Sequence, residues 1–147
     1  MMSRDDVVAE IGTSLRALVF AQQALLQRFA AEQRMSVTDV RALLAVMESA
    51  AATAPLRPGD LSDRLQLTSG AVTAVVDRLE SAGHVRRASH PDDRRSVTLE
   101  PTPKAIATGH AHFSRLAERV KAVTSQLDEV ELETIRRFLD DMLGASS

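Results

Sequence analysis

Two short amphipathic segments separated by a tight turn constrain the fold of this chain more than any other feature. Apolar residues recur every three or four positions over residues 58–65 and again over residues 68–82, which indicates two helices. Thr68 suits the N-cap of the second helix, and Gly83 suits the left-handed residue that follows its end. Residues 66–67 leave room only for a turn, so the spacing predicts a helix-turn-helix.

A basic segment with strand-like alternation follows the second helix directly. We predict two short strands over residues 84–89 and 95–99, with Val97 and Leu99 on the inward face of the second strand. Residues 90–94, His-Pro-Asp-Asp-Arg, form the polar turn between them. A β-hairpin placed immediately behind a helix-turn-helix predicts a winged helix-turn-helix.

Longer amphipathic helices are expected on both sides of this region, over residues 5–33, 36–50 and 103–125 and from residue 128 onward. The chain has four Phe and no Trp or Tyr, so its core must consist of aliphatic side chains, which favours closely packed helices. The predicted fold class is mainly α with a small β-wing, in which long N-terminal and C-terminal helices flank the winged helix-turn-helix.

Basic charge is concentrated locally in a chain whose net charge is −2. Residues 57–104 hold eight basic and seven acidic side chains, whereas residues 84–98 hold four Arg against two Asp. A short basic stretch within an acidic chain is compatible with nucleic-acid binding, because the distribution of charge matters more than its sum.

Several classes of function are not expected. The chain contains no Cys, which excludes disulfides and thiolate sites, and we expect no metal and no cofactor because His110 and His112 point to different helix faces. No nucleophile–base set and no glycine-rich phosphate loop is found, so an enzyme is not expected. No apolar stretch is long enough to span a membrane, and the N-terminus lacks the pattern of a signal peptide. We therefore expect a cytoplasmic protein that does not bind a membrane.

Five sequence blocks together resemble the MarR family of winged helix-turn-helix regulators: LSDRL at 61–65, VTAVVDRLE at 72–80, GHVRR at 83–87, PDDRR at 91–95 and VTL at 97–99. The match is densest over residues 56–104. The resemblance implies one MarR-like domain over residues 1–147, with a DNA-binding lobe at 36–100 and dimerisation helices at 5–33 and 103–145.

The chain departs from the family pattern at four places. Ser62 replaces a frequent Ala, Gln66 stands where the turn often has Gly, and His84 stands where an apolar residue is usual. The family's Leu-Thr before the last long helices corresponds here to residues 99–102. None of these positions is expected to face the DNA groove.

The helix over residues 68–82 is the expected recognition helix, because a helix fits the major groove. Arg78 could reach a guanine edge or a phosphate, and only one of Arg86 and Arg87 should face phosphate because they alternate along a strand. The resemblance implies that Arg95 enters the minor groove and that Asp93 fixes its guanidinium. The expected DNA-binding residues are Thr68, Ser69, Gly70, Thr73, Arg78, Arg86, Asp93, Arg94 and Arg95.

Plainer interpretations remain open for these residues. Thr68 and Ser69 are good N-caps in any helix, Arg78 could pair with a carboxylate one turn away, and residues 93–95 could form an ordinary solvated turn. Acidic residues near the recognition helix, Asp63, Asp77 and Glu80, weakly favour an alternative function, a winged-helix module that binds another protein and not DNA.

The favoured function is a sequence-specific transcriptional regulator, most simply a ligand-responsive repressor, that binds a pseudo-palindromic operator on double-stranded DNA. One recognition helix has a small footprint, so we expect a homodimer built from residues 5–30 and 115–143. The resemblance implies an aromatic or amphipathic small-molecule effector, and the sequence does not identify its pocket.

Overall fold

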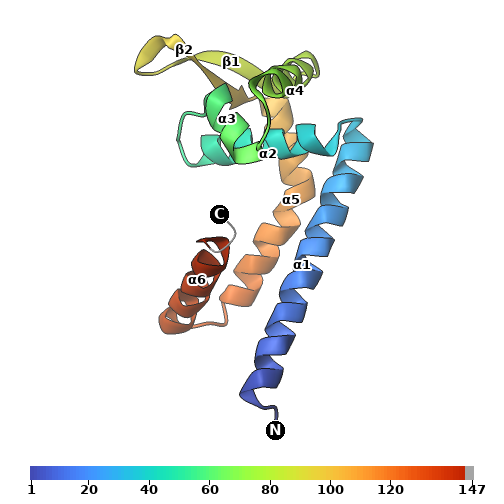
Figure 1. The fold of residues 1–147 in the computed structure, drawn as a ribbon, viewed down its shortest axis with the longest axis vertical. Coiled ribbons are helices and arrows are strands. Elements are labelled where there is room, and N and C mark those ends of the chain that lie inside the picture. The colour runs from blue at the N-terminus through green and yellow to red at the C-terminus, as the bar shows by residue number, and fades with distance from the viewer. Residues whose placement is uncertain (145–147) are drawn as a thin grey trace. The chain divides into compact units, whose positions relative to one another are not determined.

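The structure is a computed structural model, and it describes residues 1–144. The chain divides into two compact units, residues 1–108 and the part from Gly109 onward, and α5 begins in the first and ends in the second. The elements are α1 (Arg4–Gln33), α2 (Val37–Ala51), α3 (Pro58–Leu65), α4 (Ser69–Ser81), β1 (Val85–His90), β2 (Asp93–Pro101), α5 (Pro103–Thr124) and α6 (Glu129–Gly144) (Figure 1). The predicted fold class, mainly helical with one small hairpin, is confirmed.

The helix-turn-helix forms as predicted from α3 and α4. Gln66 ends α3 in the left-handed conformation, with a φ of 55°, where the resemblance placed a frequent Gly. Thr68 is the N-cap of α4, and its hydroxyl accepts a hydrogen bond of 3.2 Å from the backbone N–H of Ala71. Gly83 follows the end of α4 with a φ of 76°, in the left-handed region that glycine adopts most easily.

The core of the first unit lies between α2, α3, α4 and the hairpin. Aliphatic side chains form its main cluster, as the scarcity of aromatic residues predicts, although the largest fully buried side chain of the unit is Phe29 on α1. Its buried members are Ala42, Leu43, Ala45, Val46, Leu56, Leu61, Val72, Val75, Val76, Leu79, Val85, Leu99 and Ala105. Because α4 contributes four of these side chains at helical spacing, its opposite face is left open to solvent.

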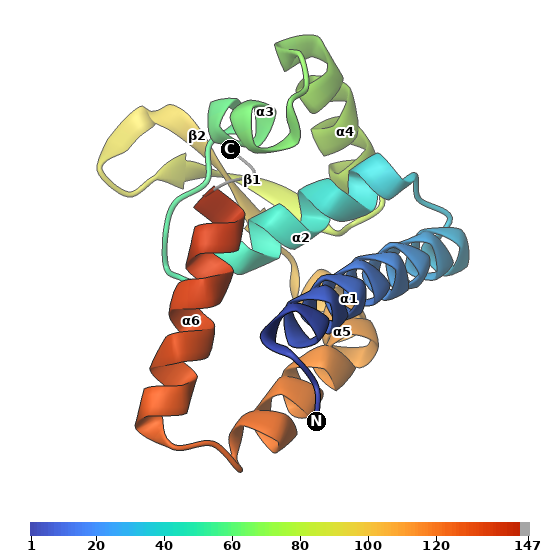
Figure 2. The same ribbon diagram turned by 60° about the horizontal axis from the view of Figure 1, so that its bottom comes forward.

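The hairpin is longer than predicted. Its strands pair with a register shift between Ser89 and His90, so that only Pro91 and Asp92 form the turn and Arg94 lies in β2. In Figures 1 and 2 the turn of the hairpin projects beyond α3 and α4. We call the part that projects, residues 89–97, the wing.

The prediction that the Val97 side chain lies on the inward face of β2 is wrong. Its side chain is 43% exposed, whereas Thr98 is buried and its hydroxyl donates to the carbonyl of Ala88 at 3.3 Å. Val97 is exposed because it lies in the wing, whereas the core cluster takes only Leu99 from β2. Leu99 is anchored in addition by its backbone N–H, which donates to the carbonyl of Leu56 at 2.8 Å.

Hydrogen bonds join the end of α4 to the start of α5. Three consecutive carbonyls accept hydrogen bonds there: Ala82 from the Lys104 ammonium at 2.8 Å, Gly83 from the Thr102 hydroxyl at 2.6 Å and His84 from the Thr102 backbone N–H at 3.0 Å. Thr102 also caps α5, because its hydroxyl accepts a hydrogen bond of 3.2 Å from the backbone N–H of Ala105. These bonds hold the backbone between α4 and β1 against the start of α5.

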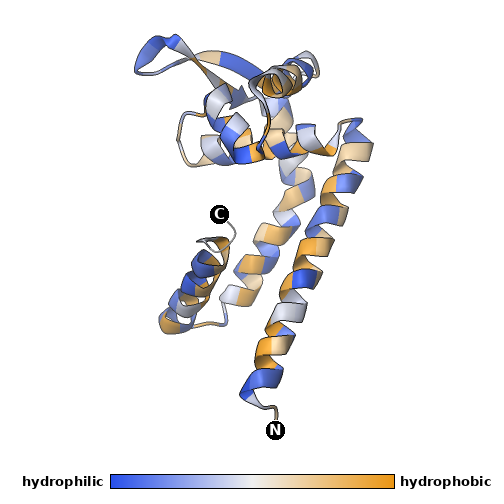
Figure 3. Cartoon of the chain, in the orientation of Figure 1, coloured by the Kyte–Doolittle hydropathy of each residue, from blue (hydrophilic) through white to orange (hydrophobic). Residues whose placement is uncertain are grey.

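Apolar residues recur along the long helices of each unit (Figure 3), and many of them are exposed. On α1 they are Val7, Val8, Ile11, Leu18, Val19 and Phe20, and on α6 they are Val130, Leu132, Ile135, Phe138, Leu139, Met142 and Leu143. No helix in the described part of the chain is long and apolar enough to cross a membrane.

Candidate nucleic-acid interface

The N-terminal turn of α4 presents small polar residues to solvent. Thr68, Ser69, Gly70 and Thr73 are all exposed, and the Thr73 hydroxyl donates to the carbonyl of Ser69 at 3.0 Å. The first backbone N–H groups of a helix have no partner within the helix, and its dipole favours negative charge at this end. The N–H groups of this turn that the Thr68 cap does not use can therefore bind a phosphate.

Gly70 has no structural reason to be glycine. A Cβ added to this residue would meet no atom within 4 Å, and its φ is not in the left-handed region. Glycine within a helix destabilises it by up to about 1 kcal/mol relative to alanine. A glycine that neither packing nor backbone conformation requires fits a surface that another molecule approaches closely.

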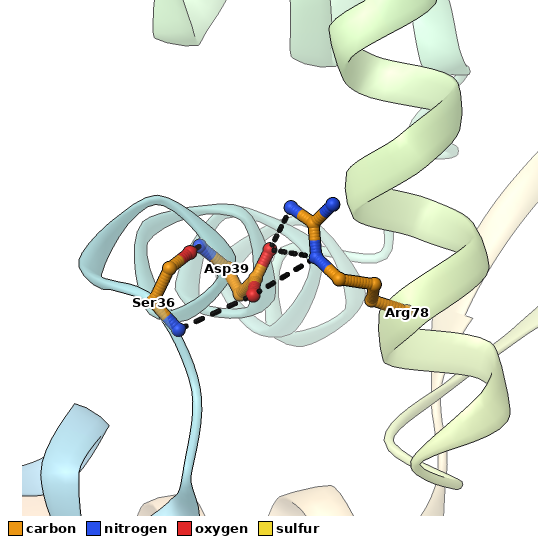
Figure 4. Close-up of polar contacts among 3 residues, drawn as sticks. All are labelled: Ser36, Asp39 and Arg78. Carbon is orange, nitrogen blue, oxygen red and sulfur yellow. Dashed lines mark hydrogen bonds and ion pairs between the residues drawn. The ribbon is translucent and has the colours of Figure 1, made fainter.

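Arg78 is held by Asp39 at the start of α2 (Figure 4). The Arg78 Nη2 donates to Asp39 Oδ1 at 2.7 Å, and its Nε lies 3.2 and 3.3 Å from the two carboxylate oxygens. The Asp39 side chain is 7% exposed and that of Arg78 is 55% exposed. Arg78 thus does pair with a carboxylate, as the plainer interpretation allowed, but that carboxylate comes from α2 and not from the next turn of α4.

Asp39 also forms the capping box of α2 with Ser36. The backbone N–H of Asp39 donates to the Ser36 hydroxyl at 3.0 Å, and the Asp39 carboxylate accepts from the Ser36 N–H at 3.3 Å. Burial alone would raise the pKa of Asp39, but the hydrogen bonds from Arg78 and Ser36 outweigh it and lower the pKa. Asp39 is ionised near neutral pH and keeps the Arg78 guanidinium in one orientation.

The two arginines of β1 point to opposite sides, as their alternation predicts. Arg86 is paired across the hairpin with Glu100, its register partner, with which it forms an ion pair. Arg87 turns toward α4 and forms ion pairs with Asp77 and Glu80. The Arg86 side chain is 65% exposed and that of Arg87 is 33% exposed, so Arg86 is the more accessible of the two.

The wing carries Arg94 and Arg95, both exposed. The Asp93 carboxylate accepts a hydrogen bond of 3.0 Å from the backbone N–H of Arg95, so it orders the backbone that carries this arginine. The implied contact of Asp93 with the Arg95 guanidinium is not formed between these two described residues.

Ion pairing separates the arginines of this surface into two groups. Arg78, Arg86 and Arg87 each have a carboxylate partner, whereas Arg94 and Arg95 have none within residues 1–144. Sequence reasoning missed Asp39 and Arg87 as partners in this surface. The capping-box position of Asp39 and the strand alternation of Arg87 were visible in the sequence, but neither identifies a partner on another element.

A cavity of about 370 Å³ lies beside the hairpin in the first unit. Its lining is largely apolar and includes Ala50, Ala54, Pro55 and Ile106 together with Glu100, the residue that pairs with Arg86. No group of three or more His, Asp and Glu side chains that could hold a metal ion occurs among the described residues.

A helix-turn-helix with an exposed second helix, followed directly by an arginine-bearing hairpin, defines the winged helix-turn-helix class of proteins. Residues 35–96 of the chain match the MarR family, and this range includes α3, α4, β1 and the turn of the hairpin. The family and the curated relatives are transcriptional regulators and not enzymes, which confirms the expectation that this chain is not an enzyme.

Relatives and solved structures agree with this assignment. The chain is 38% identical over 85 residues to the uncharacterised regulator YcgE of Bacillus subtilis, over 58% of this chain and 55% of that protein, so the alignment spans about half of YcgE. It is 27% identical to the regulator PecS of Dickeya dadantii, over 88% of this chain and 76% of PecS. A mutant of MepR from Staphylococcus aureus has the same fold, with a TM-score of 0.70 at 20% identity over 93% and 97% of the chains.

Proposed function

We propose that this protein is a sequence-specific, DNA-binding transcriptional regulator that binds double-stranded DNA as a homodimer. In this proposal α4 enters the major groove and the wing enters the adjoining minor groove. The observation that carries it is that the first unit presents both an exposed helix N-terminus with Gly70 and two exposed arginines without carboxylate partners among the described residues, Arg94 and Arg95. MepR, which shares the fold, has been solved bound to DNA.

Each site residue has a proposed role in such a complex. Thr68, Ser69, Gly70 and Thr73 meet phosphates and base edges at the start of α4. Arg94 and Arg95 approach the minor groove, and the Asp93 carboxylate orders the backbone of Arg95. The remaining arginines, Arg78 and Arg86, would contact phosphates with the nitrogens that their carboxylate partners leave available.

Selection of bound sequences from random double-stranded DNA tests this function. The expected result is a pseudo-palindrome whose half-sites are roughly 10 base pairs apart, because a twofold dimer presents two recognition helices one helical turn apart. A gel shift with the DNA upstream of the protein's own gene is the second test. Absence of any enriched sequence would favour the alternative function, a winged-helix module that binds another protein.

The wing arginines give a quantitative version of the same test. We expect Arg95→Ala to weaken binding and to lower the slope of log affinity against log salt by about one unit. Arg64→Ala is a matched control, because this exposed arginine pairs with Glu48 on α2. An unchanged affinity and slope for Arg95→Ala would remove the wing from the interface.

The homodimer is supported by the apolar side chains that α1 and α6 leave exposed in each unit. Many exposed apolar side chains on a helix are costly in water and are typical of subunit interfaces. Light scattering at micromolar concentration is expected to give twice the mass of the chain. A monomer would contradict this part of the proposal.

A repressor released by a small amphipathic molecule is the proposed mode of regulation. The cavity beside the hairpin has a size within the range of small-molecule sites, and its Glu100 is the partner of Arg86. A molecule bound there would disturb a proposed phosphate contact. A screen of aromatic and amphipathic compounds, with thermal unfolding and operator release as the two measurements, tests this mode.

A further inference from the structure

Two carboxylates lie on the recognition helix itself. Asp77 and Glu80 are three residues apart on α4, so they lie on the same side of the helix, and both are exposed. A carboxylate near DNA phosphates is repelled, and an interface between like charges is strongly disfavoured. If DNA binds to α4, the charge of these two side chains must be compensated.

One guanidinium from β1 reaches both carboxylates. The Arg87 Nη2 lies 2.6 Å from Asp77 Oδ1, and its Nη1 donates to Glu80 Oε2. The hydrogen bond to Asp77 is the main cause that raises the pKa of Arg87, and Glu80 adds to it. Arg87 therefore bridges two negative charges on one helix with one positive charge that is present at any physiological pH.

The backbone places Arg87 in this position. The left-handed Gly83 turns the chain back immediately after α4, and β1 then runs beside the helix that it has just left. Arg87 is the register partner of buried Leu99, and Arg86 on the opposite side pairs with Glu100. Arg87 is therefore the arginine of β1 that faces α4, and the fold does not allow the two arginines to exchange roles.

Folding stability does not explain this cluster. Ion pairs between exposed side chains contribute little to stability, because solvent screens them and ordering long side chains costs entropy. Asp77 and Glu80 have side chains that are 60% and 42% exposed, so this limit applies to both pairs. The larger effect of losing Arg87 is electrostatic, because two uncompensated carboxylates would remain on the helix that faces DNA.

We propose that Arg87 is a positioning residue for DNA binding, which acts by neutralising and holding back Asp77 and Glu80 on the recognition helix. The inference rests on the proposed function, since it concerns the surface that DNA would meet. It adds a required residue that need not touch DNA. It also removes the argument that acidic residues on α4 favour a protein-binding module.

Fluorescence anisotropy with the selected operator, at several salt concentrations, tests the proposal on the full-length protein. We expect Arg87→Gln to weaken binding by about tenfold or more, because like charges then face each other across the interface. Adding D77N and E80Q to this variant should restore binding to within about threefold of the original protein, because the repelling charges are gone. The D77N/E80Q protein with Arg87 intact should bind at least as tightly as the original protein.

Arg86→Gln is the matched control, since Arg86 lies on the same strand and does not contact α4. Its loss of affinity should not be recovered by D77N and E80Q. Circular dichroism and thermal unfolding show whether each variant is folded, and Arg87→Lys, which keeps the charge, should bind more tightly than Arg87→Gln.

Two results would overturn the proposal: unchanged binding by Arg87→Gln, or a loss that D77N and E80Q do not recover, which would make Arg87 a direct DNA contact or a purely structural residue. If the original protein selects no DNA sequence at all, the proposed function fails first and this inference fails with it.

Discussion

The Arg78 guanidinium on α4 is bound by the Asp39 carboxylate at the first turn of α2, with Nη2 and Oδ1 2.7 Å apart. Asp39 simultaneously completes the capping box of α2 with Ser36. One nearly buried carboxylate therefore stabilises the start of one helix and the orientation of another. On the other flank of α4, Arg87 ties Asp77 and Glu80 to β1, so the helix is held on both sides.

Replacing Asp39 by Asn should destabilise the fold. Asn retains an oxygen that can accept the Ser36 N–H, but it loses the charge that binds Arg78. We expect a loss of about 1 to 2 kcal/mol in urea unfolding, typical of a hydrogen-bonded charge. Glu48→Gln removes the partner of Arg64 in an exposed pair and should change stability little.

The pH dependence of this effect has a defined sign. The pKa of Asp39 is lowered in the folded state, so its contribution is complete above the unfolded value of 3.8 and is lost as pH falls through the folded pKa. The stability difference between the original protein and Asp39→Asn should therefore shrink on acidification below that value. A difference that stays constant to low pH would mean that the charge of Asp39 is not what stabilises the fold.

Gly70→Ala should separate stability from DNA binding. The added methyl group meets no atom of the chain, and alanine favours a helix over glycine, so we expect stability to be unchanged or higher by up to about 1 kcal/mol. DNA affinity should fall, because the methyl group would stand between α4 and the groove. Thermal unfolding and anisotropy on the same preparation check both results. Undiminished affinity would show that DNA does not approach Gly70 closely.

Gln66→Gly should stabilise the turn of the helix-turn-helix. Gln66 has a φ of 55°, a conformation that costs most residues about 1 kcal/mol and glycine little. Its side chain donates to the carbonyl of Asp63 at 2.8 Å, which offsets part of the gain. We expect a net gain of about 0.5 kcal/mol in urea unfolding. Gln66→Ala, which keeps the strained backbone and loses that bond, should instead lower stability.

His84 should make stability fall with acidification. Its side chain is 3% exposed and its Nδ1 is buried without a hydrogen-bond partner. Burial, and then the neighbouring Lys104 ammonium, lower the pKa of His84, so the folded state binds fewer protons than the unfolded state just below pH 6.5. The contribution of neutral His84 to folding stability is therefore complete above pH 6.5. It is lost as the pH falls toward the lower pKa of the folded state.

Urea unfolding at about pH 7.5 and about pH 5.5 measures this loss. His84→Leu, which introduces the kind of apolar residue that the family usually has at this position, should remove this component of the pH dependence. The carbonyls of residues 82–84 that bind Thr102 and Lys104 are backbone groups and remain available in this variant. An identical pH profile in both proteins would exclude His84 as the titrating group.

Much of the fold could be predicted because the residues that begin and end its helices act on near neighbours in the sequence. The first and last residues of α3 were predicted correctly. Thr68 and Gly83 mark the two ends of α4, and the hydrogen bonds there join residues three to five positions apart. The hairpin was predicted in the right place, but its second strand was predicted too short. Its register depends on cross-strand pairing and on the shift at Ser89, which alternation in one strand does not reveal.

The sequence by itself determined where helices begin and end, which face of α4 is apolar, and that arginines are concentrated behind it. These properties follow from periodicity and from hydrogen bonds between near neighbours. Only the tertiary structure decided which arginines are paired, because Asp39, Asp77 and Glu100 are brought to Arg78, Arg87 and Arg86 by the packing of separate elements. A charge count treats these arginines as equivalent, whereas folding leaves Arg94 and Arg95 without carboxylate partners in the described chain.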